Sequence, residues 1–436
     1  MLKYIAVLFI GVLTSFYFFP FEFASLPGAN TKMIMAAVSL VVLEIQLAKK
    51  GNAAIDRDFL VLTILAGFVS LSGLIAVSYN ETYDYTYASY IISMWVWLGG
   101  AYLTVSSMRW LHKEVTVRLI AHYLIGVCVA QCLLALVIDS SASFKDFVNT
   151  YIAGFDWVQL DQLNDGGRLY GIGATLDVAG LRFSSVLVMI AYLCMQKEVR
   201  TNNTMIVCYL LAFSFIAVVG NMMARTTTLG VILSLIYWLY AWYNDGESKR
   251  VWGWITVVIG IAIFVLTYLY QVNATFKEDI RFAFEGFFSL WEEGKWKVTS
   301  NDRLMNMFVF PDNIKTWLIG DGYIENPYKL DPYYIGPRFG GYYMGTDVGY
   351  LRFIFYFGLV GLCLFLMFFG KVTQICMQRF KGYGLLFLLI LSVNLIGWLK
   401  VSTDVFLVFA LFLCISRSNQ TNSSTNENHL LHTFHL

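Results

Sequence analysis

Long apolar windows recur along this chain of 436 residues. A helix needs about 20 consecutive apolar residues to cross the hydrocarbon core of a membrane. The windows also lack the alternation of polar and apolar residues that is typical of a lipid-facing strand. We therefore expect an all-α, polytopic membrane protein with about twelve transmembrane helices. The windows run over 4–19, 33–48, 59–78, 87–106, 118–138, 177–195, 204–222, 227–243, 252–270, 348–370, 383–399 and 401–416.

Composition and charge agree with lipid as the main solvent. Apolar residues make up 58% of the chain and charged residues only 14%, against about 25% charged residues in an average soluble domain. Lys and Arg are concentrated in alternate connections, which by the positive-inside rule places that set and both termini in the cytoplasm. The apolar run at 1–19 is too long and aromatic for a signal peptide, so we interpret it as a retained first span. The Lys- and Arg-rich connections lie near 49–58, 107–117, 196–203, 244–251 and 371–382.

The spans and loops divide the chain into six segments. Two of them, 139–176 and 271–346, are large loops on the extracytoplasmic side. The others are N-terminal helices at 1–138, central helices at 177–270, C-terminal helices at 347–417 and a polar, disordered cytoplasmic tail at 418–436.

Each large loop begins with a helical pattern of apolar residues. The pattern runs from Phe144 to Phe155 in the first loop and from Ile280 to Trp291 in the second. Such a pattern predicts an amphipathic helix lying in the membrane surface. Between spans, the aromatic and acidic stretch 79–87 is typical of an interfacial belt.

The extracytoplasmic side carries seven arginines. Guanidinium is always charged and binds phosphate through two parallel hydrogen bonds. Arg225 begins a helix, where a cation is disfavoured by the helix dipole, so we expect a partner anion. Arg182 and Arg352 lie inside spans and should face a polar cavity. The set suits a phosphate-bearing lipid substrate, although snorkelling helix ends remain an alternative; it comprises Arg168, Arg182, Arg225, Arg281, Arg303, Arg338 and Arg352.

A tyrosine-rich stretch at 323–343 follows these arginines. Aromatic faces stack on sugar rings and tyrosine adds a hydroxyl, although an interfacial belt has the same composition. The tyrosines that we predict to bind substrate are Tyr323, Tyr333, Tyr334, Tyr342 and Tyr343. We expect an extended loop here because three prolines fall within it.

Asp347 opens the span after the second large loop. It has two possible roles, a helix cap and a proton acceptor for a sugar hydroxyl. Lys400 and Asp404 have the spacing of a helical ion pair. The large loops contain neither histidine nor cysteine, so we expect no metal site there and no cofactor.

Four stretches resemble the O-antigen polymerase and ligase family, in particular the Wzy-type repeat-unit polymerases of O-antigen and capsule. Together they cover roughly 165–365 of the chain. In the family's ligases a histidine stands near the start of the span after the large loop, where this chain has Thr346 and Asp347, which favours the polymerases. The stretches are RLYGIGATLDVAGLRFSS (168–185), NMMARTTTLGVILSLIYWL (221–239), NDRLMNMFVFPDNIKTWLIGDGYI (301–324) and TDVGYLRFIFYFGLVG (346–361).

The resemblance implies a GT-C-type membrane glycosyltransferase in the bacterial cytoplasmic (inner) membrane. Its substrates would be oligosaccharide repeat units on undecaprenyl pyrophosphate, polymerised at the outer face without metal, nucleotide sugar or nucleic acid. By position, Arg225 and Arg303 would stabilise the leaving diphosphate, with Asp347 as the third catalytic candidate. Arg168, Arg182, Arg338 and Arg352 would bind substrate. Membrane lipid, a flippase and a chain-length regulator are the partners that the resemblance implies.

Two other functions remain open from the sequence. A ligase would transfer finished polymer to its final acceptor. A flippase or transporter would use the many spans and buried arginines, but the chain shows no internal repeat and no inverted pair of broken helices.

Overall fold

The computed structural model describes residues 2–50, 56–153, 168–244, 249–331 and 333–416. The tail predicted at 418–436 lies outside these residues, as does Phe155. Within the described part, regular structure is almost entirely helical. The exceptions are β1 (Glu22–Phe23) and β2 (Ile152–Ala153), which pair antiparallel.

A helix coincides with each predicted apolar window. Among the described residues, eight helices are long and apolar enough to cross a membrane: α2 (Thr31–Lys50), α3 (Arg57–Tyr79), α4 (Tyr90–His112), α5 (Val117–Ser140), α8 (Leu176–Cys194), α10 (Asn203–Met223), α12 (Lys249–Val272) and α18 (Gly349–Arg379). The windows' other helices are α1 (Leu2–Phe18), α11 (Thr227–Asn244), α19 (Gly384–Gly397) and the eight-residue α20 (Phe406–Leu413). The chain is thus a helical protein of the multi-pass membrane type, and a count of twelve spans stays a prediction.

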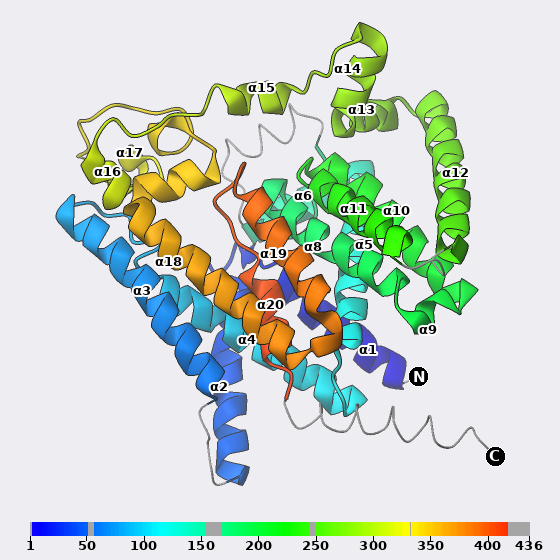
Figure 1. The fold of residues 1–436 in the computed structure, drawn as a ribbon, viewed down its shortest axis with the longest axis horizontal. Coiled ribbons are helices and arrows are strands. Elements are labelled where there is room, and N and C mark those ends of the chain that lie inside the picture. Colours follow the sequence, from blue (N-terminus) through cyan, green and yellow to red (C-terminus); the bar gives the residue numbers. More distant parts are fainter. Residues whose placement is uncertain (1, 51–55, 154–167, 245–248, 332, 417–436) are drawn as a thin grey trace.

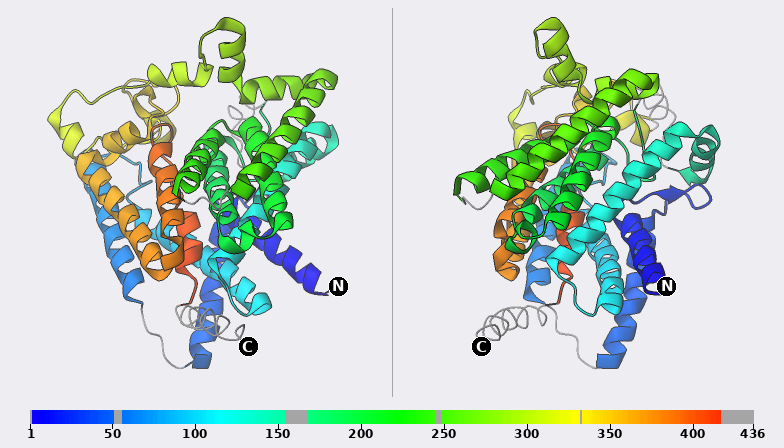
Figure 2. Two further views of the ribbon diagram at one scale, coloured as in Figure 1. Left: turned by 45° about the vertical axis from the view of Figure 1, so that its right-hand side comes forward. Right: turned by 90° about the vertical axis from the view of Figure 1, so that its right-hand side faces the viewer.

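The second large loop forms a layer of short helices across one end of the bundle (Figures 1 and 2). We call residues 274–346 the loop layer. The beginning of α1 lies at the opposite end of the molecule (Figure 1). The helices of the layer are α13 (Ala274–Ala283), α14 (Glu285–Glu293), α15 (Thr299–Met305), α16 (Ile314–Leu318), α17 (Pro327–Leu330) and the 3-10 turn η2 (Tyr343–Gly345). The remaining short helices are α6 (Ala142–Tyr151), α9 (Lys197–Arg200) and the 3-10 turn η3 (Lys381–Tyr383).

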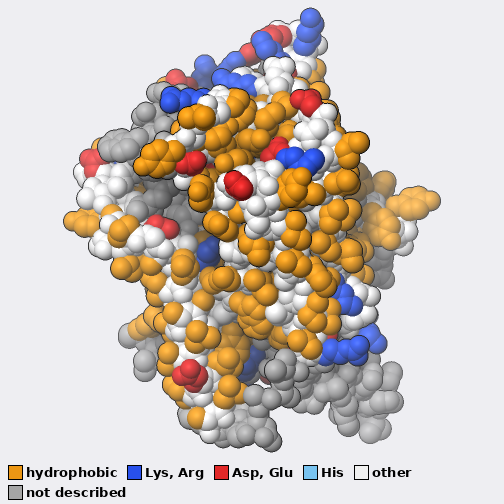
Figure 3. Space-filling view, turned by 90° about the vertical axis from the view of Figure 1, so that its left-hand side faces the viewer, with side chains coloured by type: hydrophobic (Ala, Val, Ile, Leu, Met, Phe, Trp, Pro, Cys, Tyr) orange, Lys and Arg blue, Asp and Glu red, His pale blue; other side chains and the backbone are white. Residues whose placement is uncertain are grey.

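The surface has the distribution of side chains that a membrane requires. On the face in Figure 3, hydrophobic side chains cover the middle, while Lys and Arg gather toward the two ends. The helix α12 illustrates the point because most of its side chains are exposed although they are apolar. Such a surface is stable in lipid and would favour aggregation in water.

Among the eight helices long enough to cross a membrane, α8 is the most deeply buried. Every side chain from Ala179 to Cys194 is buried, and α11 packs closely against it because Gly230 brings its backbone to Ser184. A Cβ at Gly230 would lie 2.4 Å from the Cα of Ser184. The Ser184 hydroxyl donates to the carbonyl of Thr226 at 3.0 Å and accepts from the N–H of Gly230 at 3.0 Å. This contact fixes the turn between α10 and α11, which carries Arg225.

The helix α18 is broken by a kink at Phe357 and Gly358, where Gly358 has φ of 68°. The kink frees two carbonyls that the loop layer then uses. The N–H of Asp321 donates to the carbonyl of Phe355 at 2.6 Å, and the N–H of Gly322 to that of Tyr356 at 3.1 Å. The loop layer is therefore attached to the bundle by backbone hydrogen bonds.

Three local predictions need correction. The single in-plane helix from Ile280 to Trp291 is two helices, α13 and α14, because Phe284 leaves helical geometry between them. The first in-plane helix ends at Tyr151. The stretch 323–343 is not wholly extended, since α17 begins at Pro327, where a proline costs no helical hydrogen bond.

Gly358→Ala should destabilise the protein. An added Cβ would lie 2.2 Å from the carbonyl oxygen of Leu318, and positive φ alone costs a non-glycine residue about 1–2 kcal/mol. We expect a lower melting temperature of the detergent-solubilised protein by tryptophan fluorescence. The matched control is Gly370→Ala on the same helix, where a Cβ would meet nothing within 4 Å. Equal melting temperatures for the two variants would contradict this account of the kink.

Candidate functional site

Two of the predicted arginines converge on one aromatic ring at the loop-layer end of the bundle. The guanidinium carbons of Arg225 and Arg168 lie 4.0 Å and 4.9 Å from the centroid of the Phe282 ring. Arg225 comes from the turn between α10 and α11, Arg168 from the segment before α8, and Phe282 from α13. Cations favour the negatively charged face of an aromatic ring, so Phe282 holds both guanidiniums at one place.

Arg225 is held further by the loop layer. Its Nε donates to the carbonyl of Phe282 at 2.9 Å, and its Nη1 donates to the Ser300 hydroxyl at 3.2 Å. Nη1 also lies 2.7 Å from the Glu285 carboxylate, an ion pair that is not aligned as a hydrogen bond. The partner anion expected for Arg225 is therefore Glu285, which α14 supplies.

Arg168 and Arg303 have no carboxylate partner within ion-pair distance among the described residues. Burial lowers the pKa of the Arg168 guanidinium, Asp177 opposes this effect, and the charge of Arg303 lowers the pKa further. Arg303, on α15, is exposed. We call Arg168, Arg225 and Arg303 the arginine cluster. Of the three guanidiniums, only that of Arg225 lies within ion-pair distance of a described carboxylate, Glu285, while Asp177 acts on Arg168 and Arg225 from farther away. The three arginines therefore outnumber the two carboxylates.

Arg182 lies apart from this cluster, inside α8. It is buried, and its guanidinium lies 5.7 Å from the ring of Phe19. Its Nε has no hydrogen-bond partner in the described part of the chain. The charged residues near it are Lys32 and Asp404. The structure thus places Arg182 in a separate, deeper polar group.

Arg352 belongs to a third group, at the start of α18. Its guanidinium lies over the ring of Tyr342 at 3.3 Å and 3.7 Å from Glu325. Asp347 is half-buried near it, and no residue in the described ranges donates a hydrogen bond to its carboxylate. Burial raises the pKa of Asp347, whereas Arg352 lowers it. The Thr346 hydroxyl accepts from the N–H of Val348 at 3.2 Å. However, the N-cap of α18 is Val348 and no side chain caps the helix, so neither Thr346 nor Asp347 has the predicted capping role.

The tyrosines do not line the arginine cluster. They lie on the side of the loop layer that holds α16 and α17, away from α13 and α14 (Figure 1). Tyr323 packs against Tyr343 and Tyr334, with ring centroids 5.4 Å and 6.3 Å apart. Tyr333 is 88% exposed, and Arg338 is exposed as well. The arginines and tyrosines that we predicted to bind substrate therefore lie in separate groups.

The predicted ion pair between Lys400 and Asp404 is wrong. Lys400 pairs with Asp177 at 3.0 Å. The helical spacing does not apply because α19 ends at Gly397 and α20 begins at Phe406. Asp404 instead accepts a hydrogen bond from the N–H of Phe406 at 2.9 Å.

The stretch 79–87 also contacts the loop layer, while Tyr79, Tyr83 and Tyr85 are exposed, so the interfacial belt stays a prediction. Asp84 is 1% exposed, and its Oδ2 accepts from the N–H groups of Ile324 and Glu325 at 2.8 Å and 2.9 Å. The Thr82 hydroxyl donates to the carbonyl of Gly322 at 2.9 Å. Sequence reasoning missed this role. The available signal was a lone aspartate among tyrosines, a residue that seeks backbone N–H groups when buried.

Comparison of the chain with protein-family models, with curated proteins and with solved structures returned no match.

Asp84→Ala should loosen the loop layer. The variant leaves two buried N–H groups without an acceptor, a loss of about 3 kcal/mol or more. We expect faster cleavage within 300–345 in limited proteolysis of the solubilised protein. Asp312→Ala is the control because Asp312 is exposed and lies in the same layer. If both variants were cleaved at the wild-type rate, Asp84 would not attach the layer.

Proposed function

We propose that the chain is a membrane glycosyltransferase that polymerises oligosaccharide units carried on polyprenyl diphosphate, such as undecaprenyl diphosphate. The observation that carries the proposal is the arginine cluster. Arg168 and Arg225 flank one ring at the loop-layer end of an apolar bundle, Arg303 adds a third positive charge nearby, and only Arg225 has a described carboxylate within ion-pair distance. A lipid-borne diphosphate would supply the missing negative charge and reach the cluster from the membrane. The loop layer would then face the outside of a bacterial cytoplasmic membrane, with twelve spans and both termini in the cytoplasm.

The reaction needs stabilisation of a leaving group. The growing glycan leaves its lipid diphosphate, which gains negative charge as the bond to the sugar breaks. Positive groups fixed in advance at that position lower the barrier because they need no reorganisation. Arg225 is the most firmly held of the three. Arg303 is exposed on α15 and would complete the clamp around the diphosphate.

Sugar binding would fall to the other parts of the loop layer. The tyrosine group around Tyr323 offers aromatic edges and hydroxyls for a glycan. Arg352 covers the face of Tyr342, so this face is not free to stack on a sugar. We assign Tyr342 and Arg352 a structural role beside Glu325. Arg182 would bind a deeper part of the substrate, and Arg338 the exposed glycan. A flippase that delivers the units and a regulator of chain length are the partners that this scheme requires.

A proton acceptor for the attacking hydroxyl is also required. Asp347 is one candidate, because its carboxylate is free of capping. A second carboxylate, Asp279, lies on α13, three residues before Phe282.

Arg225→Gln and Arg303→Gln should each reduce polymerisation by about 100-fold or more, the loss typical of removing one transition-state donor. The variants are expressed in a strain that lacks the chain, and glycan length is read on a gel. Arg281→Gln is the matched control, since Arg281 is an arginine of the loop layer that is already paired with Glu292 at 2.6 Å. We expect single repeats for the first two variants and long chains for the control.

Three results would contradict the proposal. One is wild-type chain length in the strain that lacks the chain. Another is wild-type chain length in both cluster variants. The third is accumulation of lipid-linked units on the cytoplasmic face, which would indicate a flippase. Each variant must first be detected in the membrane fraction at the wild-type level.

A further inference from the structure

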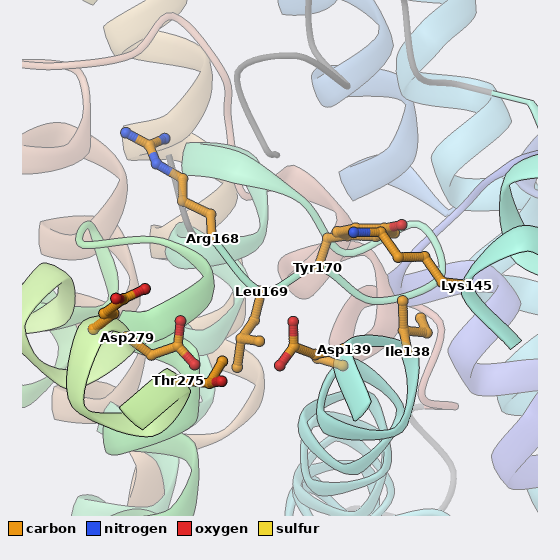
Figure 4. Close-up of a pocket in the computed structure, with 10 residues that line it drawn as sticks. Ile138, Asp139, Lys145, Arg168, Leu169, Tyr170, Thr275 and Asp279 are labelled. Atoms are coloured by element: carbon orange, nitrogen blue, oxygen red, sulfur yellow. The ribbon is translucent and has the colours of Figure 1, made fainter. Parts of the chain in front are cut away.

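A small cavity lies beneath the arginine cluster, between the end of α5 and the helix α13 (Figure 4). Its volume is about 110 Å³, which admits part of a sugar ring and excludes a whole oligosaccharide. Three carboxylates line it, from Asp139 on α5 and from Glu278 and Asp279 on α13. We call it the acidic cavity. Lys145, Arg168, Tyr170 and Thr275 complete the polar part of its lining.

Asp279 is the unusual member of this lining. It is 7% exposed, yet it accepts no hydrogen bond and forms no ion pair with any residue that the structure describes. A buried carboxylate without partners is costly and requires compensation. Figure 4 shows the carboxylates of Asp279 and Asp139 facing the space between their two helices from opposite sides. The missing partner of Asp279 therefore belongs in the cavity.

The chemistry of the lining favours hydroxyl groups as that partner. Carboxylates accept hydrogen bonds from hydroxyls, and lysine and arginine donate to them. A metal ion is a poorer choice, because the described residues include no group of three acids or other ligands close enough to hold one. Lys145, which also lines the cavity, opposes a cation further. A sugar ring, which offers several hydroxyls in a small volume, fits this mixed lining.

The helix α13 connects the acidic cavity to the arginine cluster. Asp279 and Phe282 are three residues apart on it, and residues with this spacing are neighbours on a helix face, with Cβ atoms about 5–6 Å apart. Phe282 is the ring that Arg168 and Arg225 flank. Arg168 also lines the cavity, with its guanidinium pointing away from Asp139 and Thr275 (Figure 4). One helical turn thus separates the unpartnered carboxylate from the site proposed for the diphosphate.

We propose that the acidic cavity binds the acceptor sugar and that Asp279 accepts the proton of its attacking hydroxyl. This inference rests on the proposed function and deepens it, since it assigns the acceptor site and chooses Asp279 over Asp347 as the base. Two cations, Arg352 and Lys400, lower the pKa of Asp347 against the larger raising effect of burial. The choice of Asp279 therefore rests on its position on α13, three residues before Phe282. The groups that face Asp279 are mainly acidic.

The Asp279 carboxylate takes the proton from the acceptor hydroxyl as its oxygen bonds to the anomeric carbon of the donor. The bond from that carbon to the diphosphate oxygen breaks, and the lipid diphosphate leaves with the electron pair, stabilised by the arginine cluster. Asp279 then passes the proton to the departing diphosphate or to water. No oxidant, reductant or metal is needed.

The surroundings of Asp279 suit a base that works near neutral pH. Burial raises the pKa of Asp279 to about 6, and the negative charges of Asp139 and Glu278 add to the effect. Lys145 on α6, with Arg168 and Tyr170 before α8, are the other titratable groups that line the cavity. A protonated Asp279 cannot accept a proton, so the rate should fall as pH drops through about 6.

The test uses the purified full-length chain in lipid nanodiscs with a defined single-repeat oligosaccharide on polyprenyl diphosphate. Initial polymerisation rates are measured against pH for wild type and for Asp279→Asn, which keeps the shape of the side chain. We expect a loss of roughly 100-fold or more for this variant. Asp139→Asn removes a like charge that raises the pKa of Asp279, so the acid limb of its pH profile should move to lower pH. A purely structural role for the two residues would not move this limb.

Glu292→Gln is the matched control, because Glu292 is a loop-layer carboxylate engaged with Arg281 at the surface; we expect the wild-type rate. Melting temperatures near wild type establish that the variants fold. The inference is overturned if wild type polymerises while Asp279→Asn keeps the wild-type rate and pH profile, or if Asp139→Asn leaves the acid limb in place. It is also overturned if Asp347→Asn alone abolishes the reaction. An inactive wild-type protein would instead reject the proposed function on which the inference rests.

Discussion

Backbone hydrogen bonds that lipid cannot supply are the constraint on which this architecture depends. In an apolar medium each unpaired N–H or C=O costs several kcal/mol, so a helix can be broken only where another part of the protein satisfies the freed groups. The kink of α18 at Gly358 meets this condition, because Asp321 and Gly322 donate to the freed carbonyls of Phe355 and Tyr356. Asp84 binds the next turn of the same segment. The loop layer is thereby fixed at one side of the bundle, and its other side can present α13 and α15 to the arginines.

The arginine cluster is electrostatically incomplete. Like charges at short range destabilise one another, and Arg168 is half-buried beside Arg225 and Arg303. The ring of Phe282 and the carboxylate of Glu285 offset part of this repulsion. An anionic ligand would offset the rest, so we interpret the excess charge as a binding site. The acidic cavity lies one helical turn from the arginine cluster. In a glycosyl transfer, this arrangement would let one site take the proton from the acceptor and the other stabilise the negative charge on the leaving group.

Hydropathy was sufficient to predict the apolar helices of the bundle, because a helix coincides with each apolar window. The kink was not predictable, since Gly358 lies in an apolar run that reads as an uninterrupted span. The sequence also could not predict which residues pair with the charged side chains. Lys400 and Asp404 have helical spacing, but the helix stops between them, and the true partner of Lys400, Asp177, lies on a distant part of the chain. The sequence was sufficient to identify the arginines and the end of the bundle at which they lie. The sequence did not predict the roles of Phe282 and Asp279. An amphipathic segment on its own predicts a helix face that rests on the membrane, not one that packs against the rest of the protein.

The central claim is that the arginine cluster receives a lipid diphosphate as the leaving group of a glycosyl transfer. The most direct measurement follows the release of free polyprenyl diphosphate by the reconstituted chain, supplied with a single lipid-linked repeat and with EDTA but no nucleotide sugar. The account predicts a ladder of longer glycans, with one lipid diphosphate released for each repeat that is added. Ladder formation without this release, or no ladder while the units cross the bilayer, would contradict it.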